Sequence, residues 1–325
     1  MALCAIALVV AAVLTLTIGV RGGGLVLLWQ TLSAFDPADP AHIAVQSIRL
    51  PRLVAGLIAG AALGMAGTIM QAITRNPLAD PGILGINAGA AFAVVVGSLI
   101  AQRADNGLMA ALAFPGAGAA AIAVFALGGG LRGDAGPVRL TLAGVAISAM
   151  LLSFVSAIVL ARNDALEVFR FWVTGSLAQA GMRPLGPMAA AALCGGILGL
   201  VIAPRIEALS LGSALARGLG TRPGRVQFGA LIAVTALTGA AVGVAGPIAF
   251  LGLLVPRIAR RVGGHVLRRE LAAAAMLGAA ILLYADTIGR IIIPPAEIRV
   301  GTMTVLIGAP MFIWMARRLR TGAPA

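Results

Sequence analysis

The sequence predicts an all-α, polytopic membrane protein, because its hydropathy is high, its charged residues are few and long apolar runs recur along it. Mean hydropathy is +1.02, and 60% of the residues are hydrophobic whereas 11% are charged. These values lie far outside the range of soluble domains. A helix needs ~20 apolar residues to span a bilayer, so 325 residues joined by short loops allow roughly ten spans.

The apolar runs are bounded by charge, glycine or proline and extend over the entire chain, which argues against a single soluble core. The eighth run is short and contains Pro256, so its limits are the least defined. An even number of spans places both ends on one side, and we expect a single transmembrane domain over residues 1–325. The ten predicted spans are 2–20, 53–72, 83–101, 108–130, 138–161, 186–203, 227–245, 248–258, 271–289 and 300–316.

Basic residues outnumber acidic ones by 24 to 11, and all 24 are Arg. They lie between the apolar runs, where membrane proteins carry them, so their excess does not indicate binding of nucleic acid. A Walker A phosphate loop is excluded, because it needs a Lys to reach the β- and γ-phosphates and the chain has none. We therefore expect no cofactor in this chain, and expect ATP and Mg to be bound by a partner if transport is ATP-driven.

The arginines also predict the orientation, because cytoplasmic loops are enriched in them. Cytoplasmic N- and C-termini place fifteen arginines inside and nine outside. Ser213 and His265 are then cytoplasmic, and Asp36 and Asn106 periplasmic. The inside set is Arg75, Arg132, Arg139, Arg205, Arg217, Arg222, Arg225, Arg257, Arg260, Arg261, Arg268, Arg269, Arg317, Arg318 and Arg320; the outside set is Arg21, Arg49, Arg52, Arg103, Arg162, Arg170, Arg183, Arg290 and Arg299.

No arrangement in the chain indicates catalysis or metal binding. Cys4 and Cys194 lie in apolar runs and are interpreted as small hydrophobic residues, and His42 and His265 are too far apart to suggest a metal site. Residues 2–20 lack a basic start and a small-residue cleavage site, so we interpret them as the first span rather than a signal peptide. Asp286 is the only acidic residue well inside a predicted helix, and Arg290 can neutralise it.

Two glycine-rich patterns concern helix packing. Gly56, Gly60 and Gly64 recur every four residues, so they line one face of the second span and allow a neighbouring helix to approach closely. The segment 60–69 matches the segment 239–248 at every small position, and the two run in opposite directions in the predicted topology. Such a match indicates an inverted internal repeat, as in many transporters, although two Gly- and Ala-rich helices can also resemble each other by composition.

Several motifs resemble the permease family of importers for iron-siderophores, haem and cobalamin, the type II ATP-binding-cassette (ABC) importers. They occur in the family's order from about residue 49 to 317. They are Arg49-Leu-Pro-Arg52, the stretch Gln71 to Gly82 that contains Arg75-Asn-Pro-Leu-Ala-Asp80-Pro, Gly246-Pro-Ile-Ala-Phe-Leu-Gly-Leu-Leu-Val-Pro256, Ala285-Asp-Thr-Ile-Gly-Arg290, Pro294-Pro-Ala-Glu297 and Gly308-Ala-Pro310.

The resemblance implies a dimer of permeases in the bacterial inner membrane, with the pathway at the dimer interface. The second copy is identical or paralogous, two ATPase subunits bind on the cytoplasmic side, and a periplasmic or lipid-anchored binding protein docks on the outer side. In the family, arginines at the positions of Arg49, Arg52 and Arg290 receive acidic residues of the binding protein. Guanidinium groups suit this role because they bind carboxylates bidentately. Interfacial anchoring, or an Asp286–Arg290 pair, is the alternative.

The segment 204–225 is the longest connection that we place inside, and its Leu, Ala and Arg pattern suits short amphipathic helices. The resemblance implies that it contacts the ATPase; the alternative is a solvated connector. Ser213 and Ala214 stand where the family usually carries acidic residues, and Arg257 where it commonly carries His. The predicted coupling residues are Leu211, Gly212, Ser213, Ala216, Arg217, Gly218, Leu219 and Gly220.

The family places an additional short helix and a gate near the connection 162–187 and along the preceding span, Thr141 to Leu160. Our candidates for gate or pathway residues are Gly144, Ser148, Phe169 and Trp172. An apolar constriction suits a gate because it excludes water on closing, whereas Trp172 as an interfacial anchor is the alternative.

Three functional hypotheses from different classes follow. The first is the permease of an ATP-driven importer, for a ferric siderophore or alternatively for haem or cobalamin. A siderophore is preferred because aromatic residues make up only 4% of the chain and two His leave little to ligate haem. The second is an ion-coupled transporter, which would need carboxylates in the membrane. The third, an intramembrane enzyme, would need catalytic groups that we do not find.

Overall fold

The computed structural model describes residues 1–19, 23–102, 105–130 and 137–320, and within these ranges the chain is helical and has no strand. Six helices are long and apolar enough to cross a membrane: α4 (Leu50–Thr74), α6 (Asn106–Leu127), α7 (Pro137–Ala161), α9 (Leu185–Ser210), α11 (Pro223–Ala245) and α13 (Leu267–Ile292). Three further apolar helices are α1 (Ala2–Thr17), α5 (Ile86–Ala101) and α14 (Val300–Arg320).

The eighth predicted span, 248–258, corresponds to a short helix, α12 (Leu251–Gly263). It begins later than predicted because Phe250 adopts a left-handed conformation, φ 67°, which no helix accommodates. Pro256 lies inside α12 without ending it. The third span also begins later, at Ile86, because residues Pro81–Leu84 form a separate 3-10 turn.

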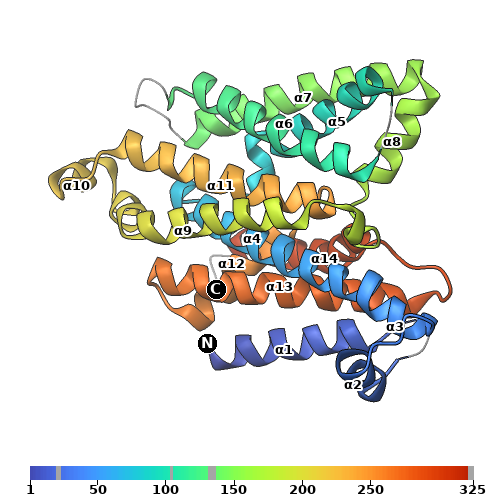
Figure 1. Cartoon of the computed structure of the whole chain (residues 1–325). Coiled ribbons are helices and arrows are strands. Elements are labelled where there is room, and N and C mark those ends of the chain that lie inside the picture. Colours follow the sequence, from blue (N-terminus) through green and yellow to red (C-terminus); the bar gives the residue numbers. More distant parts are fainter. Residues whose placement is uncertain (20–22, 103–104, 131–136, 321–325) are drawn as a thin grey trace.

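Short helices join the spans at the two ends of the bundle. Figure 1 shows α2 (Leu25–Ser33), α3 (Pro40–Ala44) and α8 (Asn163–Val173) at one end, called the α3 end below. At the opposite end lies α10 (Ser213–Gly218), together with the start of α1 and the end of α14. The α10 end also holds the connection from α12 to α13.

The connection predicted as 204–225 is shorter than expected. Pro204 lies within α9, which continues to Ser210, and Pro223 already begins α11. Proline is tolerated at the first turn of a helix because the amide it lacks has no intrahelical acceptor there. The connection therefore runs from Leu211 to Arg222 and contains α10.

The core of the bundle is formed by α4 and α11, whose residues are mostly buried, whereas most of α7 is exposed. These two helices contain the matching glycine-rich segments, contact each other and run in opposite directions (Figure 1). On the face of α4 that meets α13, an added Cβ at Gly60 would lie 2.5 Å from the carbonyl oxygen of Gly278 and 2.6 Å from the Cα of Ala279. Backbone contacts of this kind replace the hydrophobic drive that lipid removes.

Candidate functional site

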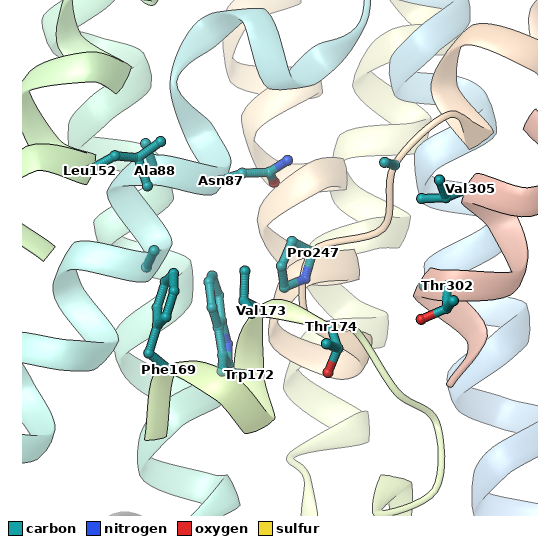
Figure 2. A pocket seen from close by; sticks show the side chains of 13 residues that line it. Asn87, Ala88, Leu152, Phe169, Trp172, Val173, Thr174, Pro247, Thr302 and Val305 are labelled. Carbon is teal, nitrogen blue, oxygen red and sulfur yellow. The ribbon is translucent and has the colours of Figure 1, made fainter. Parts of the chain in front are cut away.

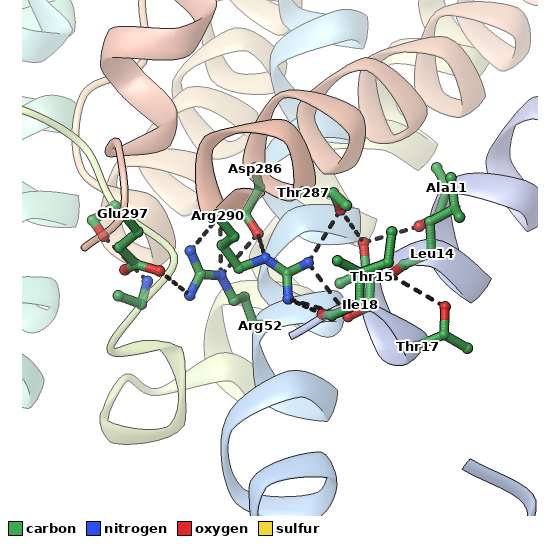
Figure 3. A network of polar contacts seen from close by, with 12 residues as sticks. Ala11, Leu14, Thr15, Thr17, Ile18, Arg52, Asp286, Thr287, Arg290 and Glu297 are labelled. Atoms are coloured by element: carbon green, nitrogen blue, oxygen red, sulfur yellow. Dashed lines mark hydrogen bonds and ion pairs between the residues drawn. The ribbon is translucent and has the colours of Figure 1, made fainter. Parts of the chain in front are cut away.

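Four charged residues, here called the arginine cluster, meet at the α3 end between α4, α13 and the connection to α14 (Figure 3). They are Arg52, Asp286, Arg290 and Glu297. Arg52 donates from Nε and Nη2 to the carboxylate of Asp286, with distances of 2.8–3.0 Å, and from Nη1 to Glu297 Oε2 at 2.9 Å. Asp286 is completely buried and Glu297 is one-third exposed. Two carboxylates thus occupy two edges of one guanidinium group.

Arg290 uses a different kind of acceptor, the carbonyls at the end of α1. It donates to the oxygen of Ile18 at 2.8 Å and to that of Thr15 at 3.3 Å, and its Nε lies 3.4 Å from Asp286. Arg49 donates to the oxygen of Leu16 at 2.9 Å. The last carbonyls of a helix have no intrahelical donor and carry partial negative charge, so a cation stabilises them.

The three arginines predicted to receive a binding protein are therefore buried and bonded within the chain. Arg49, Arg52 and Arg290 are exposed by 4%, 5% and 7%, respectively. The predicted pair of Asp286 with Arg290 is present, but Asp286 is held more closely by Arg52, which sequence reasoning missed. The cluster ties α1 and α4 to α13, and the docking role of its arginines stays a prediction.

A cavity of about 420 Å³ lies between α5, α7, α8 and the start of α14, near the α3 end. Figure 2 shows Phe169 and Trp172 projecting from α8 on one side of it, with Pro247 and Thr302 on the other sides. Trp172 is 4% exposed, so it packs into the bundle and is not an exposed interfacial anchor. The cavity has mainly apolar walls and a few polar groups, including Asn87 and Thr302, as small-molecule sites commonly have.

Two of the four gate candidates line this cavity, namely Phe169 and Trp172. Gly144 and Ser148 do not, but they lie two turns and one turn, respectively, before Leu152, which does. Residues four apart share one face of a helix, so all three lie along the same side of α7. Ser148 faces the junction of the 3-10 turn with α5, where its Oγ is 3.5 Å from the position a Cβ would take at Gly85.

The segment after α8 connects the cavity to the helix ends around it. The amide of Ser176 donates to the oxygen of Ala245 at 2.7 Å, and the amide of Gly301 donates to that of Gly175 at 3.2 Å. Arg183 donates to the oxygen of Val244 at 2.8 Å. Burial lowers the pKa of the Arg183 guanidinium to about 10, so it remains charged at neutral pH. These bonds fix the irregular chain around Gly246, which forms one wall of the cavity.

The α10 end presents a stripe of leucines. Leu211, Leu215 and Leu219 recur every four residues and are each at least 60% exposed, whereas Ala216 is completely buried. Gly212 precedes α10 with φ 116° and Gly220 follows it with φ 74°, conformations that favour glycine. Of the other predicted coupling residues, Ser213 begins α10, Gly218 ends it, and Arg217 is exposed.

The motif after α4 packs against the start of α12. Asp80 accepts from the amide of Gly82 at 2.7 Å and its other oxygen approaches Gly252 of α12. Burial raises the pKa of the Asp80 carboxyl, although the bond from Gly82 opposes the rise. Over the described residues, no group of three or more His, Cys, Asp or Glu is placed to hold a metal ion.

A helical bundle with six helices long and apolar enough to cross a membrane, packed through glycine-mediated contacts, is typical of a polytopic membrane protein. The chain belongs to the FecCD transport family, whose profile matches residues 7–318. It is accordingly a permease subunit of an ABC importer and not itself an enzyme.

Individual relatives agree with this assignment. The chain is 41% identical over 315 residues to the ferric enterobactin transport system permease protein FepD of Escherichia coli K12, covering 97% of this chain and 94% of the relative. It is 39% identical to the probable siderophore transport system permease protein YfiZ of Bacillus subtilis, over 89% and 87% of the two chains. A solved structure described as an inward-facing conformation of a putative metal-chelate type ABC transporter superposes with a TM-score of 0.84, at 25% identity and 97% coverage of both chains.

Proposed function

We propose that this chain is the permease of a bacterial inner-membrane importer for ferric siderophores, with both termini in the cytoplasm. The observation that carries the proposal is the 41% identity, over nearly the whole chain, to a permease named for ferric enterobactin transport. Composition supports it, because 4% aromatic residues and two His offer little to ligate haem. In a siderophore the chelator already ligates the iron, so the permease needs to contact only the organic shell.

The cavity at the α3 end is the proposed part of the pathway. Phe169 and Trp172 offer aromatic faces, and Asn87 and Thr302 offer hydrogen bonds. The exposed apolar face of α7 borders it through Leu152. We place the second permease copy, identical or paralogous, along this face, so that the pathway is completed by both copies. Gly144 is buried and Ser148 is half-buried on the side of α7 that faces α5, so we propose that they act from behind this face.

The leucine stripe of α10 is the proposed contact with the ATPase, one for each permease copy. Large exposed apolar side chains outside the spans are disfavoured unless a partner covers them. Leu211 and Leu219 flank the helix and Arg217 adds a charge on the exposed side. A separate ATPase is required because this chain has no Walker A lysine.

The arginine cluster is the proposed place for a carboxylate of the binding protein. Asp286 holds Arg52 from the buried side, whereas Glu297 holds its Nη1 from the side that reaches solvent. A partner carboxylate would therefore enter at Glu297 and replace it. Arg49 and Arg290 add positive charge behind this position while they bind the end of α1.

Uptake in a cell that lacks its own siderophore permeases tests the proposal. We expect accumulation of a ⁵⁵Fe-loaded siderophore that requires this permease, its ATPase and ATP. Ferric tris-catecholate, ferric hydroxamate, hemin and cobalamin are compared at equal concentration. Uptake that persists with an inactive ATPase would show an ion-coupled transporter instead, and uptake of hemin or cobalamin in preference to both siderophores would refute the proposed cargo.

A further inference from the structure

A second cavity, here called the basic pocket, lies at the α10 end. Its volume is about 680 Å³, and it opens between Gly130, beyond the end of α6, and the turn from α10 to α11. Arg217, Arg222 and Arg225 line it, with Thr221 between them. Among the described residues that line it, none is acidic.

The three arginines of the basic pocket are exposed, and in the described ranges none has an ion pair or a side-chain hydrogen bond. The acidic residue nearest in sequence, Glu207, accepts a hydrogen bond from the amide of Leu267. In the arginine cluster, by contrast, every guanidinium has acceptors within the chain. Three guanidinium groups around one concavity present many donors to an anion, and they favour phosphate because their planar forks match its oxygens.

An apolar stripe continues from the basic pocket into the span. Arg225, Phe228 and Ile232 are three and four residues apart and therefore share one face of α11. Phe228 is 50% exposed and Ile232 is 45% exposed. At a rise of ~1.5 Å per residue, Phe228 lies roughly 9 Å and Ile232 roughly 15 Å along the helix from Arg222. Phe228 is itself braced by Phe125 of α6, with ring centroids 5.9 Å apart.

We propose that the basic pocket binds the phosphate headgroup of an anionic phospholipid, whose acyl chain lies along Phe228 and Ile232. A phospholipid has an anionic headgroup followed by apolar acyl chains. Along α11, the arginines of the basic pocket come first and the exposed Phe228 and Ile232 follow, so each part of the lipid meets a matching surface. Basic pockets between spans at the cytoplasmic side bind anionic headgroups for this reason. The inference rests on the proposed membrane orientation and does not depend on the cargo.

An acidic surface of the ATPase is the competing occupant of the basic pocket, and the geometry disfavours it. The side chains that suit a soluble subunit are the exposed leucines of the α10 region, and α10 lies at the end of the bundle, beyond the spans (Figure 1). Phe228 and Ile232 lie within the helix that crosses the membrane, where a soluble subunit does not reach. A phospholipid can contact both the arginines of the basic pocket and the apolar stripe of Phe228 and Ile232.

The test is native mass spectrometry of the detergent-purified full-length permease, titrated with phosphatidylglycerol. The variant R222Q/R225Q removes two charges from the basic pocket and leaves the predicted coupling residues intact. The control R261Q/R269Q removes two exposed arginines at the same end that lie outside the pocket. Phosphatidylcholine is the lipid control, and inorganic phosphate and glycerol phosphate are added as soluble competitors. Thermal unfolding of all variants shows whether each is folded.

We expect wild type and the control to bind phosphatidylglycerol with similar affinity, and R222Q/R225Q to bind it roughly thirtyfold more weakly, since each basic residue contributes about fivefold near an anionic surface. Equal losses in both double variants would show general charge attraction and refute the site. Effective competition by inorganic phosphate would assign the pocket to a soluble anion instead. If R222Q/R225Q binds lipid like wild type but no longer co-purifies with the ATPase, the basic pocket is part of the ATPase contact instead. Because this assay uses neither ATP nor a chelate, its failure is distinct from a failure of the uptake assay.

Discussion

At the scale of single residues, the arginine cluster shows how this membrane protein keeps charge in its interior. Arg52 faces two carboxylates, and Arg290 and Arg49 face the carbonyl oxygens of α1. Removing one partner of a buried pair leaves an uncompensated charge, which costs far more than losing an exposed pair. The cluster is therefore expected to matter for folding whether or not a partner docks there.

Asp286→Asn tests the folding role. It leaves Arg52 without its closest carboxylate, and we expect a loss of about 3–5 kcal/mol in the free energy of unfolding. Asp164→Asn is the matched control, because Asp164 is 80% exposed and pairs with the exposed Arg162 at 3.5 Å; its cost should stay below about 1 kcal/mol. Thermal unfolding in detergent measures both. Equal stability of D286N and wild type would show that Arg52 is solvated and that the cluster has no structural role.

Glu297→Gln tests the docking role without disturbing Asp286. It frees Nη1 of Arg52 for a partner carboxylate, so affinity for the binding protein should rise about fivefold, as expected for a partly exposed pair. The exposed Glu167 of α8 supplies the control E167Q at the same end. Docking is measured at two salt concentrations, because it should weaken as charges are screened. Unchanged or reduced affinity in E297Q would leave Arg52 a purely structural residue.

The sequence contained every residue of the cluster but not their pairing. Asp286 and Arg290 are one helical turn apart, so their contact follows from periodicity alone. Arg52 and Asp286 are separated by 234 positions, and their contact depends on how α4 crosses α13. Burial of Arg49 and Arg290 was also hidden, because both donate to backbone carbonyls at the end of α1, which cannot be recognised from side-chain patterns.

At the scale of elements, the contact of α4 with α13 depends on the absence of side chains. Gly60→Ala adds a methyl group against the backbone of Gly278 and Ala279, and we expect a loss of about 1–3 kcal/mol as for overpacking. Gly118→Ala in α6 is the matched control: its Cβ would have only the methyl group of Thr235, at 3.9 Å, within 4 Å, and the change should be neutral or stabilise by about 0.5–1 kcal/mol. Folded yield and thermal unfolding separate the two. Equal behaviour of both variants would show that this face of α4 tolerates a side chain.

The exposed face of α10 gives the second test at this scale. Leu215→Gln removes the central apolar residue of the stripe, so the amount of ATPase that co-purifies with the permease should fall severalfold. Val266→Gln is the control, because Val266 is 48% exposed in the turn between α12 and α13 at the same end. Neither substitution changes the net charge of the protein. Retention of the ATPase by L215Q at the level of V266Q would place the contact elsewhere on this end.

Element limits show where sequence patterns are reliable. Long apolar runs predicted both limits of α7 and the end of α11 closely, because a helix that crosses the bilayer needs this length of apolar sequence. The limits of α12 and the end of α9 were wrong because both depend on local backbone conformation. Pro204, which we took as the end of a span, lies inside α9, and the left-handed Phe250 determines the start of α12.

At the scale of the whole molecule, the predicted topology requires the two ends of the bundle to face different compartments. The structure brings Ser213 and the α12–α13 turn to the α10 end, and Asp36 and the start of α6 to the α3 end (Figure 1). The arginine count favours a cytoplasmic α10 end, since fifteen of 24 arginines then lie inside.

Labelling of single cysteines in intact cells tests this orientation. The background is C4A/C194A, because Cys194 is exposed on α9 and would react on its own. Cysteine at position 36 or 106 should react with a membrane-impermeant thiol reagent in intact cells, whereas cysteine at 213 or 265 should react only after the membrane is opened. All four variants must support uptake, which shows that each is correctly inserted. Reaction of positions 213 and 265 from outside, with protection of positions 36 and 106, would show that the orientation is the opposite of the predicted one. The arginine cluster would then face the cytoplasm, where no periplasmic binding protein could reach Arg52, and the basic pocket would face the periplasm, so both functional assignments depend on this outcome.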